Sequence, residues 1–309
     1  MPKTEAKKPA DFIVPLDING LNGRMLHMTA PAGKNREILF VYGHHASLER
    51  CYGIAEDLNQ YGAVTIPDLP GFGGMDSLYK IGQKPTLDNL ADYLATFVKL
   101  RYRRKRVTII GFSFGFVVAT RMLQRYPDLA KKVDLLVSAV GFASHDDFNF
   151  TPARRRLYHF GAKLFSLRIP AMFFRNIALS PPVLRTVYAH TKNAREKFAG
   201  LSKQRHREIM DFEIHLWHCT DVRTYMFTSD IFFTFDNCGV RVKLPVWHVA
   251  VDADRYFDNH RVEQHLGVIF DDVTVVKSRM KGHAPSIMLT KEEARPFIPP
   301  KIRQLLSER

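Results

Sequence analysis

The sequence predicts an α/β protein with a mainly parallel central sheet, helices on both of its faces and an inserted helical segment. First, short aliphatic runs typical of buried strands alternate with helical patterns along most of the chain. Second, residues 107–119 join such a run to a helical pattern through Gly-Phe-Ser-Phe-Gly. Third, the alternation stops near His145 and resumes after about Asp236. The pattern therefore predicts an α/β core interrupted by a helical insertion.

The first part of the core begins with two short antiparallel strands within residues 11–30, because apolar residues alternate there and Asn19-Gly20 and Asn22-Gly23 are turn signals. Thr86 is the expected N-cap, with Asp88 in the first turn, of a helix that reaches about Leu100. The other expected elements are a strand at 37–42, a helix ending near 60, a strand at 63–66, a loop at 67–74, a strand at 108–110, a helix at 116–124 and a strand at 133–140.

The whole chain divides into three segments at two boundaries. We expect residues 1–144 to form the first part of the core, residues 145–236 a helical cap, and residues 237–309 the second part of the core. That second part should hold strands at 244–251 and 272–276, a helix at 259–266, and a final helix from Lys291. Thr290 and Glu293 predict a capping box for the final helix, whose start is left uncertain by Pro296.

The Gly-x-Ser-x-Gly segment at 111–115 predicts a nucleophilic serine. A strand that turns directly into a helix strains the residue at the turn, and its neighbours two positions away must be small, which Gly111 and Gly115 satisfy. Ser113 would then be held clear of the sheet beside amides at a helix N-terminus, where a developing oxyanion is stabilised. An ordinary tight turn is the alternative interpretation of the short pattern alone.

A serine nucleophile needs a general base, usually His, and a carboxylate that orients the base. In a sheet of this kind both should come later in the chain, the carboxylate first, on loops after strands. Asp254 follows the strand at 244–251, and His283 follows the strand at 272–276. Asp252 and Asp258 lie close enough in sequence to replace Asp254, or to serve the loop's own hydrogen bonds.

These ordered motifs resemble the α/β-hydrolase superfamily over both parts of the core. The segment 111–115 is similar to the nucleophile turn of that family, and Gly282-His283 to its late Gly-His. Residues 42–44, Tyr-Gly-His, resemble its His-Gly-x oxyanion loop, 68–73 the loop of its lid-bearing members, and 125–127 its Arg-Tyr-Pro.

The resemblance implies that Ser113 is the nucleophile, His283 the general base and Asp254 the orienting acid. It also implies that the backbone amides of His44 and Phe114 form the oxyanion hole. The chain departs from the family where Tyr42 replaces the usual histidine, which puts the internal hydrogen bonds of that loop in doubt. A serine at the turn argues against the dehalogenase and epoxide-hydrolase branches, which use Asp there.

The inserted segment is rich in aromatic residues, most of which we expect to pack the cap onto the sheet, with a few lining an apolar pocket. They include Phe148, Phe150, Tyr158, Phe160, Phe165, Phe173, Phe174 and Tyr188. Because residues 154–188 are basic as well as aromatic, attachment to an anionic membrane surface is an alternative, and core packing with a solvated basic face is the favoured interpretation.

Composition and charge limit the compartment and the kinds of ligand that the protein can have. A hydrophobic fraction of 46% supports a sizeable core, and the three scattered cysteines indicate free thiols in a reducing, cytoplasmic environment. Residues 1–10 lack the apolar stretch of a signal peptide. The net charge of +14 favours anionic ligands, but no nucleic-acid recognition motif accompanies it. His44 and His45 have no third ligand nearby, so we expect no metal and no cofactor.

The sequence therefore predicts a hydrolase of carboxylic esters or thioesters that works through an acyl-enzyme. Its substrate would be a small molecule with an apolar acyl or aromatic group, and basic residues near the pocket would suit an anionic one. Hydrolysis of carbon-carbon bonds, acyl transfer and a non-catalytic binding role are the alternatives on the same fold. The oligomeric state is not readable from the sequence.

Overall fold

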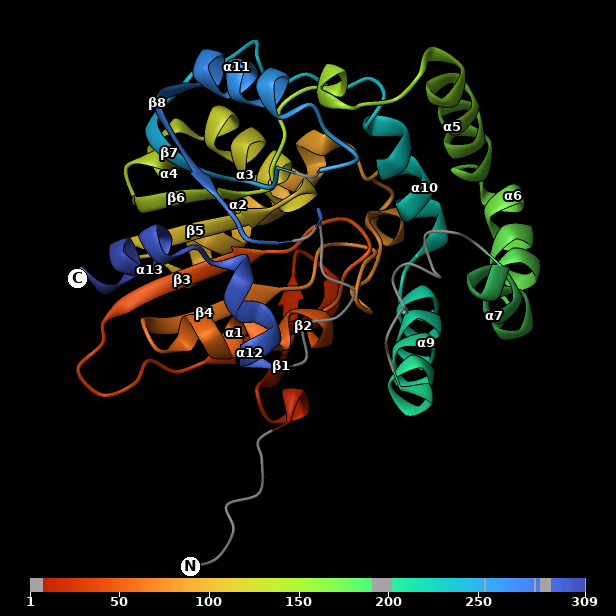
Figure 1. Ribbon diagram of the computed structural model, residues 1–309, viewed down its shortest axis with the longest axis horizontal. Helices are drawn as coiled ribbons and strands as arrows, with labels where there is room; N and C mark the ends of the chain where they lie inside the picture. The colour runs from red at the N-terminus through yellow and green to blue at the C-terminus, as the bar shows by residue number, and fades with distance from the viewer. Residues whose placement is uncertain (1–7, 191–201, 253, 281, 284–289, 309) are drawn as a thin grey trace, which may run out of the picture.

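The computed structural model describes residues 8–190, 202–252, 254–280, 282–283 and 290–308. Its centre is an eight-stranded sheet in the order β1-β2-β4-β3-β5-β6-β7-β8 (Figure 1). The pairs β1–β2 and β2–β4 are antiparallel and all the others are parallel, which confirms the predicted mainly parallel sheet. The strands are β1 (Ile13–Ile18), β2 (Leu21–Met28), β3 (Arg36–Val41), β4 (Gly62–Pro67), β5 (Val107–Phe112), β6 (Val133–Ala139), β7 (Val242–Ala250) and β8 (Phe270–Lys277).

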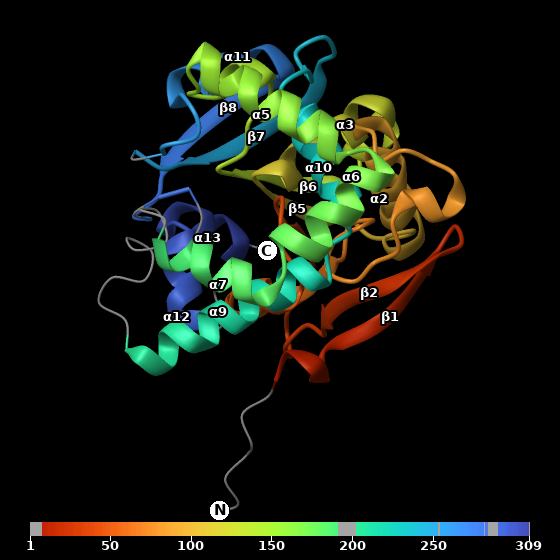
Figure 2. The same ribbon diagram turned by 90° about the vertical axis from the view of Figure 1, so that its right-hand side faces the viewer.

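Helices cover both faces of this sheet, as predicted. Figure 2 shows α12 and α13 on one face, and α2 and α3 on the other. Helix α1 packs against α12, and α11 packs against β8. Their bounds are α1 (Tyr52–Asn59), α2 (Leu87–Arg101), α3 (Phe114–Arg125), α4 (Pro127–Ala130), α11 (Asn259–Ile269), α12 (Lys291–Ala294) and α13 (Pro300–Ser307). The Thr86 hydroxyl accepts a hydrogen bond from the Asn89 amide at 3.2 Å, so the predicted N-cap of α2 is present.

The prediction of one final helix from Lys291 is wrong, because this segment forms two helices, α12 and α13. After α12 the chain makes a 3-10 turn at Arg295–Phe297 and then begins α13. Pro296, Pro299 and Pro300 lack the amide hydrogen that a continuous helix would need, and Pro300 occupies the first turn of α13, where no such hydrogen is required. The Thr290 hydroxyl does accept from the Glu293 amide, at 3.2 Å.

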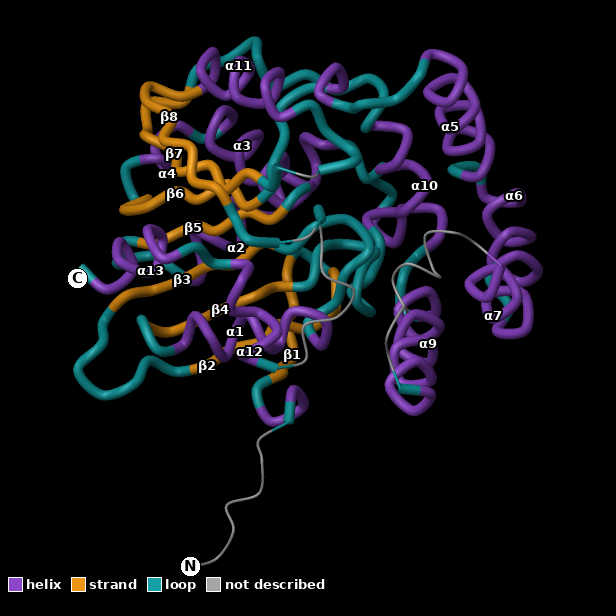
Figure 3. Tube along the Cα trace, viewed as in Figure 1, coloured by secondary structure: helices purple, strands orange, loops and turns teal. Residues whose placement is uncertain are grey.

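Between β6 and β7 the described residues form helices and contribute no strand to the sheet. These helices are α5 (Pro152–Phe165), α6 (Arg168–Phe173), a π-helical turn (Phe174–Ala178), α7 (Pro181–His190), α9 (Lys203–His218) and α10 (Val222–Ile231). Figure 1 shows α10 closest to the sheet and α5, α6 and α7 in an outer layer. The tube in Figure 3 separates these helices clearly from the strands.

The outer layer departs from the expectation that the aromatic rings of this segment pack inward. Phe148 packs against the main core, but Phe160 is 68% exposed and Phe173 is 56% exposed. An amphipathic pattern tells which residues share a helix face, not which face the rest of the molecule covers. In the described part of the chain, no helix has the length and apolar character needed to cross a membrane.

Candidate active site

The turn from β5 into α3 gives Ser113 a strained backbone, with φ 50° and ψ −119°. A Cβ on Gly115 would lie 2.1 Å from the Val41 carbonyl oxygen, and a Cβ on Gly111 would lie 2.5 Å from Phe116 Cα. Both glycines are therefore required by close backbone approach. Such strain is stored mostly at functional sites, and here it presents the serine hydroxyl at the carboxyl end of the central strand.

The structure brings Ser113, His283 and Asp254 together from three separate loops. His283 Nε2 lies 2.9 Å from Ser113 Oγ, and His283 Nδ1 lies 2.7 Å from Asp254 Oδ2. The side chains of His283 and Asp254 are only 10% and 3% exposed, so this chain of hydrogen bonds is shielded from water. The arrangement is the one that a serine nucleophile, a base and an orienting carboxylate require.

The three nearby aspartates differ in what their carboxylates contact. Besides His283, Asp254 accepts hydrogen bonds from the Tyr256 and Phe257 amides at 2.8 and 3.3 Å, which fix its orientation. Asp252 is exposed and pairs with Lys277 at 2.9 Å, and Asp258 caps α11. Of the three, Asp254 is the one that the structure places on His283.

The loop after β3 lies directly against the serine turn. A Cβ on Gly43 would lie 3.2 Å from both Ser113 Cβ and the Phe112 carbonyl oxygen. This contact places His44, the next residue, beside the nucleophile turn. As the first residue of α3, Phe114 has an amide that makes no hydrogen bond within the helix. The positions predicted for the oxyanion hole, His44 and Phe114, thus belong to two adjoining segments.

Tyr42 takes a structural role in that loop. Its hydroxyl donates to Asp68 Oδ1 at 2.9 Å and accepts from the Leu69 amide at 2.8 Å. Burial raises the pKa of the Asp68 carboxyl well above its usual value, although Arg24 lies 3.3 Å from Oδ2 and opposes the shift. Tyr42 therefore joins the loop after β3 to the loop after β4. The loop after β3 is thus held by hydrogen bonds although Tyr42 replaces the usual histidine.

The imidazole of His44 points away from the sheet and binds α10. Its Nε2 lies 2.8 Å from Thr228 Oγ1, whose own hydrogen points to the Thr224 and Tyr225 carbonyls. His44 Nε2 is therefore the donor in this bond. Burial, and then the neighbouring His45, lower the pKa of His44 to about 3, so its ring is neutral at physiological pH.

Helix α10 is also fixed to the loop after β4. Thr224 packs so closely on Gly71 that a Cβ there would lie 2.6 Å from its methyl carbon, and Ser77 Oγ lies 2.7 Å from Thr224 Oγ1. The Asp221 amide donates to the Gly71 carbonyl at 2.8 Å. Helix α10 is thus held against the loops beside the serine by several independent contacts.

Aromatic side chains surround the serine turn and its histidine. The ring of Phe232 lies 5.2 Å from that of Phe114 and 4.9 Å from that of His44, and Phe257 lies 5.0 Å from His283. Sequence reasoning missed Phe232, Phe257 and the α10 residues Tyr225 and Thr228. The spacing of 225, 228 and 232 by three and four places them on one helix face and was the available signal.

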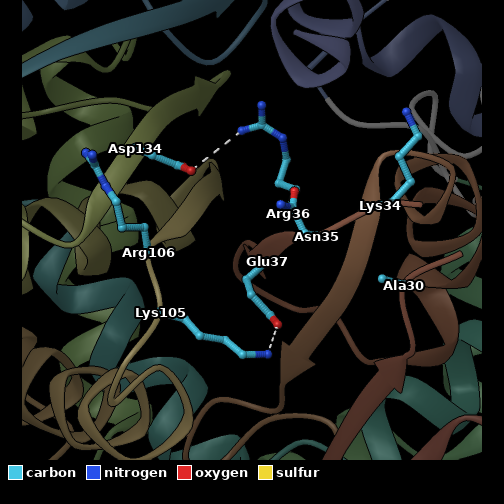
Figure 4. Close-up of a pocket in the computed structure, with 8 residues that line it drawn as sticks. All are labelled: Ala30, Lys34, Asn35, Arg36, Glu37, Lys105, Arg106 and Asp134. Carbon is cyan, nitrogen blue, oxygen red and sulfur yellow. Dashed lines mark hydrogen bonds and ion pairs between the residues drawn. The ribbon is translucent and has the colours of Figure 1, made fainter. Parts of the chain in front are cut away.

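A surface cavity lies at the opposite edge of the sheet from Ser113. It has a volume of about 700 Å³ and is lined by Arg36, Glu37, Arg106 and Asp134, among others (Figure 4). These residues stand at the amino ends of the parallel strands, whereas Ser113 follows a carboxyl end. This cavity therefore plays no part in the serine site. Among the described residues, no cluster of three His, Cys, Asp or Glu is arranged to hold a metal ion.

Comparison with known proteins identifies the fold. Residues 37–162 match the family model described as "alpha/beta hydrolase fold". No curated protein matches the sequence significantly. Among solved structures, an esterase from Exiguobacterium antarcticum aligns with a TM-score of 0.68 and 13% identity, over 94% of this chain and 97% of its own.

Two further solved structures are similar over nearly their whole length. A thermophilic esterase from Thermogutta terrifontis aligns with a TM-score of 0.61 and 16% identity, over 95% of this chain and 97% of its own. The enol-lactonase from Burkholderia xenovorans LB400 aligns with a TM-score of 0.61 and 13% identity, over 95% and 98%. The family match and the sheet topology confirm the resemblance predicted from the sequence: this chain is a protein of the α/β-hydrolase fold.

Proposed function

We propose that this protein is a serine hydrolase that cleaves carboxylic ester or thioester bonds through an acyl-enzyme. The observation that carries the proposal is the buried chain of hydrogen bonds from Ser113 through His283 to Asp254. The fold also occurs in esterases and in an enol-lactonase, which supports hydrolysis of an acyl bond without identifying the substrate.

In the first half of the reaction, Ser113 Oγ forms a bond to the acyl carbon while His283 Nε2 takes its proton. The carbonyl oxygen becomes negative, and the amides of His44 and Phe114 stabilise that charge. His283 then gives the proton to the leaving alcohol or thiol as its bond to the acyl carbon breaks. In the second half, a water molecule repeats the same steps and releases the acid, with the proton returning to Ser113.

Asp254 supports both halves by accepting a hydrogen bond from His283 Nδ1 at 2.7 Å. That bond keeps the proton on Nδ1, so that Nε2 is free to act as the base, and it stabilises the imidazolium that forms. The amides of Tyr256 and Phe257 hold the other carboxylate oxygen and so fix the acid itself.

We infer that residues 145–236 act as a cap over this site, as the sequence suggested. Support comes from α10, which contacts both His44 and the loop after β4. Phe232 at its end and Phe142 after β6, with rings 5.7 Å apart, make the surroundings of the serine aromatic. Such a lining fits a small-molecule substrate with an apolar acyl or aromatic group, which closure would shield from water.

A fluorophosphonate probe, which reacts with activated serines, tests the proposal directly. We expect it to label the wild-type protein and to leave Ser113→Ala unlabelled. Ser138→Ala is a matched control, because Ser138 Oγ also lies 2.9 Å from a histidine nitrogen, that of His248, but the pair is buried away from solvent. Labelling that survives Ser113→Ala, or is lost in Ser138→Ala, would contradict the assignment.

Turnover measurements then define the bond that is cleaved. We expect hydrolysis of p-nitrophenyl esters, with a rate that depends on acyl-chain length. Faster cleavage of a carbon-carbon bond in a diketone-type acid, or transfer of the acyl group to an added alcohol in place of water, would replace ester hydrolysis by one of the other reactions of this fold. A folded protein that is neither labelled nor active would be a binding protein.

A further inference from the structure

The outer helical layer exposes an unusual number of large apolar side chains. Leu157 is 67% exposed, Phe160 68% and Ile169 64%. Leu167, Met172 and Phe173 are each more than half exposed as well. Figure 2 looks onto this layer and shows α5, α6 and α7 in front of the rest of the molecule. We call the exposed side of these three helices the outer face. These exposed side chains come from helices that contact one another along the chain, α5 with α6 and α6 and α7 with the π-helical turn between them. Exposed apolar residues gathered in this way mark a site of interaction.

The helices of the outer face carry charge of one sign only, although Arg155 and Arg185 pair with Asp146 and Asp211 of neighbouring elements. From residue 151 to residue 190 the sequence contains no Asp or Glu, whereas Arg154, Arg156, Lys163 and Arg168 are all exposed there. In each of α5 and α6 the exposed apolar residues stand beside these cations. A face that is both apolar and cationic complements a surface that is apolar inside and anionic outside.

A basic groove continues the outer face toward the body of the molecule. It has a volume of about 490 Å³ and is lined by Arg168, Met172, Arg175 and Arg223, with Asp221 among the remaining residues. Arg223 is held in place by a hydrogen bond to the Ser166 carbonyl at 3.1 Å. The groove therefore brings several cations to the edge of the apolar surface.

We propose that the outer face binds the surface of an anionic lipid bilayer. Its apolar side chains enter the boundary between headgroups and acyl chains, and its cations contact the lipid phosphates. A second copy of this chain is a poorer occupant, because two such faces would bring together cations with no carboxylate between residues 151 and 190 to pair with them. Binding is peripheral and requires no membrane-spanning helix.

This inference does not depend on the proposed chemistry. The outer face belongs to α5, α6 and α7, which lie farther from the sheet than α10 (Figure 1), so bilayer binding is expected of Ser113→Ala as much as of the wild type. Loss of hydrolysis and loss of bilayer binding are therefore separate results, obtained from different variants.

Flotation or co-sedimentation with lipid vesicles tests the proposal. The full chain should bind vesicles that contain phosphatidylglycerol, bind vesicles of phosphatidylcholine alone at least about tenfold more weakly, and be released by high salt. Leu157→Asp should weaken binding about tenfold or more, since it places a charge within the apolar surface. Leu100→Asp is the matched control, because Leu100 is also 67% exposed but lies on α2.

The results that overturn the proposal are equally definite. They are equal binding to both vesicle types, absence of binding, or a larger effect of Leu100→Asp than of Leu157→Asp. Light scattering adds a further test: a wild-type dimer that Leu157→Asp dissociates, without vesicle binding, would make the outer face a contact between copies. Circular dichroism and turnover of a dissolved short ester should be unchanged in both variants, which excludes unfolding as the cause of lost binding.

Discussion

Gly115→Ala is a sharp test of the close approach between the serine turn and the loop after β3. The added Cβ would lie 2.1 Å from the Val41 carbonyl oxygen and 2.4 Å from that of Tyr42. Ordinary contacts begin at 3.4 Å, at least 1 Å farther away, and the Val41 oxygen belongs to a strand held between β4 and β5, so it cannot turn aside. The loop and the turn must therefore move apart.

The size of the effect follows from two opposing contributions. Overpacking of this kind costs about 3 kcal/mol at the upper end of its range, and alanine in a helix recovers about 1 kcal/mol relative to glycine. We expect the free energy of unfolding to fall by about 2 kcal/mol. Because the loop carries the His44 amide, a shift of about 1 Å should also lower kcat/KM for ester hydrolysis by about 100-fold.

Urea unfolding followed by tryptophan fluorescence, together with ester turnover, measures both effects. Gly161→Ala is the control, since a Cβ at this position in α5 meets nothing within 4 Å. That variant should be slightly more stable than the wild type and fully active. If Gly115→Ala unfolds at the same urea concentration as the wild type and retains its activity, the close approach that we infer does not exist in solution.

Three further predictions concern single side chains. Tyr42→Phe removes two buried hydrogen bonds and should lower the free energy of unfolding by about 3 kcal/mol in urea titrations, whereas Tyr52→Phe should cost less than about 1. Asp254→Asn should reduce kcat by about 10⁴-fold, and an unaffected rate or an equal loss in Asp252→Asn would remove Asp254 from the mechanism. Burial lowers the pKa of His248 to about 4 from 6.5, so the unfolded state takes up its proton first as the pH falls. The neutral His248 therefore contributes fully to the free energy of unfolding above pH 6.5, and about 3 kcal/mol of that free energy is lost as the pH falls toward 4. His248→Gln should flatten the dependence of the free energy of unfolding on pH in this range.

The parts of the site that are encoded locally were predictable from the sequence. The turn around Ser113 follows from an aliphatic strand, two glycines and an apolar helix that are contiguous in the chain. His283 and Asp254 were found because loops after late parallel strands converge on the same edge of a sheet. What the sequence left open was which of three aspartates faces the histidine, since that depends on backbone hydrogen bonds within the loop.

The helices between β6 and β7 were predictable as helices but not in their placement. Phe148 and Phe160 both looked like packing residues, yet the first packs against the main core and the second is 68% exposed in the outer layer. Tyr225 and Thr228 went unnoticed because their role depends on contact with His44, which is 184 residues from Thr228 in the chain. Their spacing places these residues on one helix face, but the residue that this face meets is decided by tertiary packing.

His44 connects the serine turn of the core to helix α10 of the inserted segment. Its backbone lies beside the serine turn, next to Gly43, while its ring donates to Thr228 and stacks on Tyr225 at 4.2 Å. Because burial keeps the ring neutral, the bond to Thr228 persists across the physiological pH range. The residue whose amide would stabilise the oxyanion is thus positioned by α10, the innermost helix of the segment whose outer layer carries the apolar and basic face. Cover and surface attachment would then share one helical unit, with the catalytic loops of the core on its inner side and the bilayer on its outer side.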